Sequence, residues 1–275
     1  MVKKLYKYEY RAYWLWNVLL YAAIIATALI LRVTLSLIFK VPRISTIGFV
    51  GDLSVWESAV LFAAFAIFCI TLSAGFTLVI IMPIVRFYKN LLTSEGYLTL
   101  SIPVTPAKHL ICKTVVAYTY FCGAILSLIA AICIILAGWE DSVEIFTAIG
   151  DGIAEIFTTL FDQSAAAIIS FIAISIAIIL MPAATMLLYY FCLSMGMLFG
   201  KYKIIGAVVF YIGLETAFSV LWGSVQIILM PILLAIENEE VFMLVFSLGF
   251  LIFVIAEICV FFGFSNHMFK HKVNI

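Results

Sequence analysis

The sequence predicts an all-α membrane protein with six transmembrane helices and both termini in the cytoplasm. Three observations predict this fold class. Apolar residues make up 66% of the 275 residues and charged residues only 11%, whereas a soluble domain is about half apolar and a quarter charged. The apolar residues fall into six long runs, and Lys and Arg collect in alternate connections between these runs. We therefore expect the lipid bilayer, rather than water, to surround most of the chain.

The first element is a basic and aromatic segment, residues 1–16, which mixes lysines with several Tyr and Trp residues. This composition is typical of an amphipathic helix that lies in the headgroup plane. An aromatic belt leading into the first span would have a similar composition. Of these two interpretations we favour the interfacial helix.

Six apolar runs are long enough to span a bilayer, which takes about 20 residues in a helix. In lipid the backbone must satisfy its own hydrogen bonds, so we expect helices rather than strands. The expected spans are residues 17–39, 58–82, 111–137, 165–190, 204–235 and 242–264. The fifth run is longer than a straight span needs, and Gly223 and Pro231 are natural break points. Its helix is therefore expected to end near Gln226, followed by a short re-entrant element on the outer side.

The basic residues set the orientation, because Lys and Arg favour cytoplasmic loops. One side of the membrane would hold Lys3, Lys4, Lys7, Arg11, Arg86, Lys89, Lys108, Lys113, Lys201, Lys203, Lys270 and Lys272. The other side would hold only Lys40 and Arg43, together with most of the acidic residues. Both termini and the 83–110 connection are therefore expected in the cytoplasm.

The connection at residues 138–164 would lie outside and be amphipathic. Its isoleucines, from Ile145 to Ile156, recur at helical spacing with acidic residues between them, which predicts a helix on the outer surface. We expect a break near Gly150 and Gly152. A solvated helix face and a surface that attracts cationic molecules would both give this pattern.

Three charged residues, Arg32, Glu215 and Glu257, fall inside the expected spans. Charges are costly in lipid and indicate a functional site by default. Glu215 and Glu257 would lie at similar depth on consecutive helices, whereas Arg32 could extend toward the outer interface. Two interpretations stay open for these residues. They line a translocation path or share a proton, or they form polar contacts between helices or subunits.

The chain shows no catalytic constellation and no metal or cofactor site. Residues 196–202 superficially resemble a phosphate-binding loop, but they have three residues between the glycines instead of four, and Tyr202 stands where Ser or Thr would hold magnesium. His267 and His271 have no third ligand nearby in the sequence. The six cysteines lie within or beside apolar runs, which favours small buried hydrophobic residues over a disulfide framework. We expect neither an enzyme nor a nucleic-acid-binding protein.

The connection at 83–110 carries ordered turn signals. Ser94, Glu95 and Gly96 should turn the chain, and Thr105 with Pro106 is typical of a helix start. The segment is therefore predicted to be a small folded element with a surface to pack on, either lipid headgroups or another protein.

In residues 83–113, the pattern RFYKNL, EGYL, PV, HL and K follows the second span. Together with six spans, cytoplasmic termini and a basic N-terminal helix, it resembles ABC transporter permeases of the type-2 exporter class, in the form common in Gram-positive bacteria. The topology of the resemblance covers nearly the whole chain. The acidic 138–164 loop departs from the family pattern.

The resemblance implies that 83–110 is a coupling segment, whose coupling helix docks on a separate ATPase subunit. The residues implied at this contact are Phe87, Tyr88, Lys89, Asn90, Leu91, Glu95, Gly96 and Tyr97. Pro103 and Lys113 would shape the start of the third span. The resemblance also implies two ATPase subunits that bind ATP and Mg, a second permease chain, identical or different, and a place in the bacterial plasma membrane.

The function expected from the sequence is therefore the permease subunit of an ATP-driven exporter, with amphipathic or antimicrobial peptides as the favoured substrates. Two alternatives remain. An intramembrane enzyme would use Glu215 with Glu257, and a non-transporting membrane scaffold would have no ATPase partner.

Overall fold

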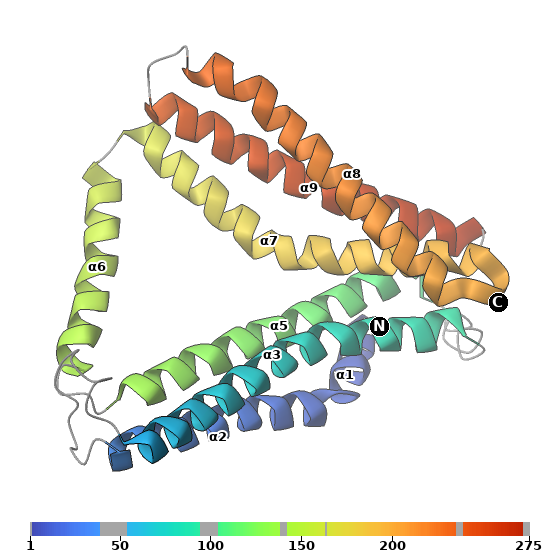
Figure 1. Cartoon of the computed structure of the whole chain (residues 1–275). Helices are drawn as coiled ribbons and strands as arrows, with labels where there is room; N and C mark the ends of the chain where they lie inside the picture. Colours follow the sequence, from blue (N-terminus) through green and yellow to red (C-terminus); the bar gives the residue numbers. More distant parts are fainter. Residues whose placement is uncertain are drawn as a thin grey trace. The chain divides into compact units, whose positions relative to one another are not determined.

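The computed structural model describes residues 2–38, 54–93, 104–137, 142–162, 164–234 and 239–271. In these ranges the chain is helical, without strands (Figure 1). The helices are α1 (Val2–Arg11), α2 (Trp14–Ile38), α3 (Val55–Leu92), α5 (Pro106–Leu136), α6 (Ser142–Asp162), α7 (Ala165–Gly196), η1 (Met197–Tyr202), α8 (Lys203–Leu234) and α9 (Glu239–His271). The all-α class predicted from the sequence is confirmed for this part of the chain.

Six of the helices, α2, α3, α5, α7, α8 and α9, are long and apolar enough to cross a membrane. They overlap the six expected spans, and the chain is a multi-pass membrane protein. Large apolar side chains cover the helix surfaces, such as Trp56, which is 82% exposed, and Ile227, which is 75% exposed. Water would not tolerate so large an apolar surface, whereas lipid does.

Two helices are more continuous than the sequence suggested. The expected break near Gln226 is wrong, because α8 runs through Gly223 and Pro231 to Leu234. Proline removes a single backbone donor, and a membrane helix that continues keeps its remaining backbone hydrogen bonds satisfied. The described residues therefore leave no separate re-entrant element before Leu234. The expected break in α6 at Gly150 and Gly152 is also wrong, since this helix is unbroken.

The N-terminal segment forms a helix of its own, α1, which a turn at Ala12 and Tyr13 separates from α2. Lys3, Lys4, Lys7 and Arg11 are exposed, while Glu9 on the same helix is buried. A separate helix with an exposed basic side agrees with the amphipathic helix that the sequence predicts at residues 1–16. Its position in the headgroup plane stays a prediction.

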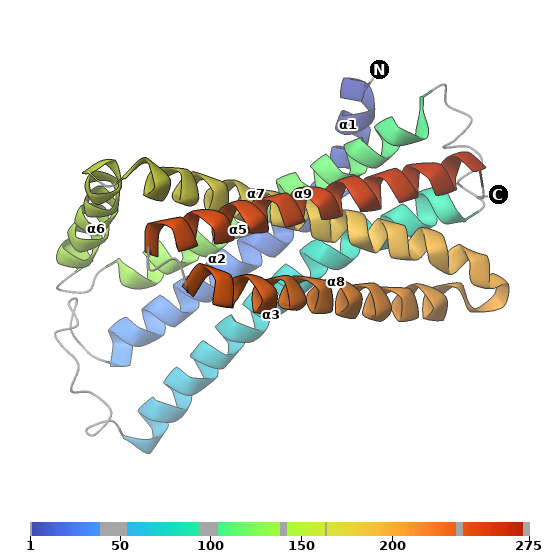
Figure 2. The ribbon, with the colours of Figure 1, turned by 90° about the horizontal axis from the view of Figure 1, so that it is seen from above.

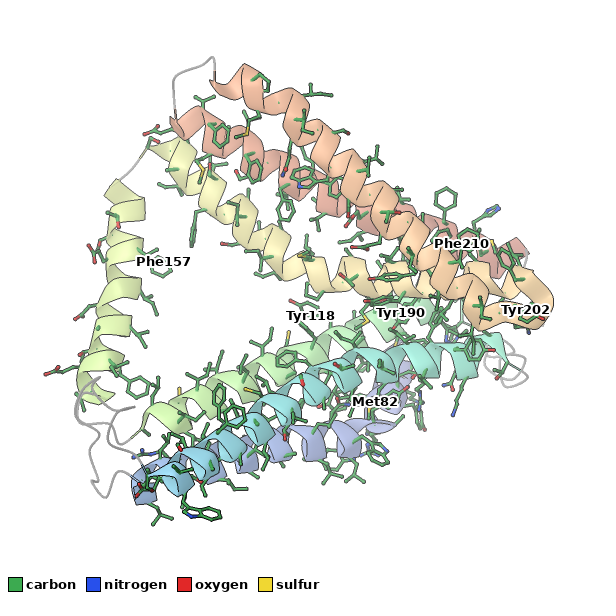
Figure 3. The ribbon with its side chains drawn as sticks, viewed as in Figure 1. Met82, Tyr118, Phe157, Tyr190, Tyr202 and Phe210 are labelled. Atoms are coloured by element: carbon green, nitrogen blue, oxygen red, sulfur yellow. The ribbon has the colours of Figure 1, made fainter. Side chains whose placement is uncertain are left out.

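The chain divides into two compact units. Unit 1 comprises Met1–Tyr6, Pro83–Tyr118 and Phe157–Ile275, and unit 2 comprises Lys7–Met82 and Thr119–Ile156. Helices α1, α3, α5 and α6 each pass from one unit to the other. Met82, Tyr118 and Phe157, which lie at these transitions, are labelled in Figure 3.

Unit 2 is held together by close helix packing and by tyrosines. Its apolar core joins α2, α3 and α5, with small side chains at the contacts that let the helices approach closely. The core residues are Ile24, Ala28, Leu31, Ala64, Phe68 and Ala131. The Tyr21 hydroxyl donates to the carbonyl of Tyr120 at 2.7 Å, and the rings of Tyr10 and Tyr120 stack at 5.1 Å. These contacts connect α1, α2 and α5.

Unit 1 is built around α7, which packs along α9 and against α8 (Figure 2). Ala177, Ala184 and Val254 form its apolar core. The turn η1 leads from α7 into α8, with Gly200 at a positive φ of 52°. The chain passes so closely here that a Cβ on Gly196 would lie 2.5 Å from the carbonyl oxygen of Lys203. Glycine at position 196 therefore allows α8 to fold back against the end of α7.

Candidate functional site

The last turns of α3, which carry all the described residues implied in the ATPase contact, have a buried face and an accessible face. Phe87 and Leu91, one helical turn apart, are 0% and 2% exposed. Lys89 is exposed, and Tyr88 and Asn90 are half-buried. This arrangement is that of an amphipathic helix end, whose apolar face is already covered by the rest of unit 1.

The buried face is fixed by an aromatic cluster. The ring of Phe87 stacks on that of Tyr190 in α7, with centroids 4.1 Å apart and planes 10° apart. Phe269 of α9 meets Phe87 edge-on, with centroids 5.7 Å apart. Tyr190, labelled in Figure 3, is itself 0% exposed. The end of α3 is thereby joined to α7 and α9.

The beginning of α5 joins the same packing. His109 and Leu110 are each 1% exposed, and with Pro106 they surround a crevice shared with Phe87, Leu91 and Phe269. The crevice leaves no room for a water molecule. Lys113, one turn further along α5, is also buried, at 5% exposure. Both described ends of the coupling segment, before residue 94 and after residue 103, are therefore built into unit 1.

The structure narrows the set of implied contact residues. Phe87 and Leu91 face the interior of unit 1, so a direct contact with another subunit would require them to leave this packing. Tyr88, Lys89 and Asn90 stay available. The positions Glu95, Gly96, Tyr97 and Pro103 lie outside the described residues.

A polar cluster lies among the membrane helices of unit 1. Glu215 of α8 and Glu257 of α9 are close enough to interact electrostatically. The side chain of Tyr189 in α7 lies beside that of Tyr211 in α8 and also lies within electrostatic range of Glu215. The two tyrosine rings are 5.2 Å apart.

Arg32, the third charged residue within a span, belongs to α2 in unit 2. Its side chain is half-buried, and Nη1 has no hydrogen-bond partner within the described part of the chain. Of the three charged residues within the spans, Arg32 therefore belongs to unit 2, and Glu215 and Glu257 belong to unit 1.

One turn of α7 lies next to both the aromatic cluster around Phe87 and the polar cluster around Glu215. Tyr190 contacts Phe87, while Tyr189 and Cys192 lie near Glu215. These α7 residues were not identified from the sequence, although two adjacent tyrosines inside an apolar run are a usable signal. A movement of the α3 end that shifts Tyr190 would also shift the surroundings of Glu215.

The described residues contain no group of three His, Cys, Asp or Glu side chains that could hold a metal ion. All six cysteines are free, with Cys112 and Cys192 buried and Cys69, Cys133 and Cys259 exposed on membrane helices. The expectation that all six are buried is therefore wrong for the exposed three. Lipid can cover a thiol as readily as a protein core can, so hydropathy alone does not separate the two locations.

Comparison with protein-family models, curated proteins and solved structures finds no match to this chain.

Proposed function

We propose that this chain is the transmembrane permease subunit of an ATP-driven exporter of the ABC type-2 class. In this proposal two copies of a separate ATPase subunit bind ATP and Mg, and a second permease chain, identical or different, completes the transporter in the bacterial plasma membrane. Six apolar helices and the resemblance of residues 83–113 support the proposal. Amphipathic or antimicrobial peptides are the proposed substrates.

The observation that carries the proposal is the packing of the α3 end. A helix of 38 residues is about 57 Å long at 1.5 Å per residue, well beyond a hydrocarbon core of about 30 Å. Part of α3 must therefore extend past the bilayer. Near the C-terminal end of α3, which extends into the cytoplasm in our proposal, Phe87 packs against Tyr190 and Phe269. A force applied there reaches α7 and α9 directly, because packed interiors transmit displacement rather than absorb it.

The proposed coupling has a thermodynamic requirement. ATP binding can drive a change in the permease only if the ATPase contacts its two conformations with different free energies. The accessible side of the α3 end, with Lys89 and its neighbours, is the described surface on which such a contact would form. Glu215 and Glu257 would then line the path and attract cationic groups of the substrate.

Charge reversal at Lys89 tests this assignment. We expect Lys89→Glu to reduce co-purification of the ATPase subunit from native membranes and to reduce substrate-stimulated ATP hydrolysis, because it reverses the charge at the proposed contact. Lys89 is exposed, so the substitution should leave the fold of unit 1 intact. Lys4→Glu, which reverses another exposed lysine outside the coupling segment, is the matched control. Glu95→Lys should act like Lys89→Glu. Unchanged co-purification and hydrolysis in both coupling variants would contradict the assignment.

The electrostatic contact of Glu215 with Glu257 favours one second candidate, an intramembrane enzyme that uses the two carboxylates. The two functions differ in what the neutral variants do. If Glu215→Gln and Glu257→Gln leave ATP-dependent transport intact and abolish a hydrolytic activity of the purified chain, the enzyme is the correct function. The permease proposal expects altered transport and no such activity.

A further inference from the structure

A small cavity lies between the last turns of α8 and the first turns of α9, within unit 1. Its volume is about 80 Å³. The residues that matter most for its character are Trp222, Gln226 and Met230 of α8 and Phe242, Phe246 and Gly249 of α9. The ends of the two helices that enclose it are visible in Figure 1. Its described lining residues all belong to α8 and α9, away from the described part of the coupling segment.

Aromatic packing holds the walls of the cavity in place. The Trp222 ring lies 6.1 Å from Phe246, 5.5 Å from Phe250 and 4.9 Å from Phe253, measured between centroids. Phe242 stacks on Phe246 at 6.3 Å. Such a set of mutually packed rings fixes the side chains, so the space exists before any ligand enters.

Glycine at position 249 leaves the space open. A Cβ built there would meet no atom within 4 Å, even though bulky aromatic residues stand nearby on the same helix. Several lining side chains, including Val225, Met230 and Phe246, are also exposed on the lipid-facing surface, at 41%, 50% and 37%. The cavity is therefore reached from the surface that the acyl chains of the bilayer cover.

The lining restricts the chemistry of the occupant. Among the described residues that line it, none is ionisable and the Gln226 amide is the single strongly polar side chain, so an ion or a charged peptide group would find no charged partner among them. A volume of about 80 Å³ is roughly half that of the apolar cavity of about 150 Å³ known to bind benzene. The space therefore suits the narrow end of a flexible hydrocarbon chain and is too small for a ring system.

We propose that this cavity binds the acyl chain of a membrane lipid. The chain enters from the lipid-facing surface beside Met230 and packs against Trp222 and Phe246. The site does not depend on the proposed transport function, and it would be present in an enzyme or a scaffold with the same fold.

Photoreactive lipid tests the site. The full chain is reconstituted in nanodiscs that contain phosphatidylglycerol with a diazirine near the end of one acyl chain, and the labelled residues are identified by peptide mass spectrometry. We expect labelling at Met230, Phe242 and Phe246 above that at Ile178, a lipid-exposed residue of α7 outside the cavity.

Two matched variants separate a bound chain from surrounding lipid. Gly249→Leu fills the space, so the excess labelling should fall to the level at Ile178. Gly263→Leu, on the same helix and also facing open space, should leave it unchanged. Gly249→Ala, a smaller change, should cause an intermediate loss of the excess labelling. It keeps the test valid if the leucine variant misfolds. Labelling that is no higher in the cavity than at Ile178, or that is unaffected by both Gly249 variants, overturns the proposal, as does protection of these positions by a second protein chain.

Discussion

At the scale of single residues, Phe87 shows how one side chain serves a purpose different from the one its pattern suggests. Its position in an amphipathic segment after a membrane span is compatible with docking on another protein. In the structure its ring is fully buried between Tyr190 and Phe269. An apolar face looks the same in the sequence whether it packs on its own chain or on a partner, so only the tertiary contacts separate the two.

Truncation of this ring should destabilise unit 1. We expect Phe87→Ala to cost about 3 to 5 kcal/mol, the range for removing a buried aromatic ring, and to lower the thermal unfolding midpoint in detergent. Val85→Ala, at a position two residues away that is 43% exposed, is the control and should change stability by about 0.5 kcal/mol or less. Equal effects of the two substitutions would show that the Phe87 cluster does not hold α3 in place.

At the scale of elements, the existence of the helices was predictable and their ends were not. Hydropathy is a local property, and about 20 apolar residues identify a span without knowledge of its neighbours. The continuation of α3 to Leu92 depends on packing against α7 and α9, which the sequence does not display. Glycine and proline residues suggested breaks in α6 and α8. Both helices continue through these residues, because the neighbouring backbone hydrogen bonds are kept. The carboxylate pair was predictable because its two helices are consecutive, whereas Tyr189 and Tyr190 reach the site through folding of a distant segment.

The rotational setting of the α3 end is testable. One alanine inserted between Ile84 and Val85 rotates the following residues by about 100°, since an α-helix has 3.6 residues per turn. Phe87 would then turn away from Tyr190, and we expect loss of ATPase-coupled transport together with lower thermal stability. The matched control is one alanine inserted after Ala137, just past the end of α5, where we expect both properties to be kept. Normal transport by the α3 insertion would exclude a rigid α3 end as the coupling element.

At the scale of the whole molecule, the structure and the sequence agree that this is an all-helical, multi-pass membrane protein. The energy source lies beyond the chain in our proposal, because the sequence contains no nucleotide-binding motif. Coupling in this proposal therefore requires a surface on which a second polypeptide exerts force. The accessible side of the α3 end, opposite the buried Phe87 cluster, is the described surface that meets this need.

Site-specific crosslinking tests whether the α3 end contacts an ATP-binding subunit. A photoreactive amino acid is placed at Lys89 in native membranes, with the same amino acid at Lys7, another exposed lysine, as the control. We expect a crosslink from position 89 to an ATP-binding subunit and none from position 7. Crosslinks from position 89 only to lipid or to this chain itself would contradict it.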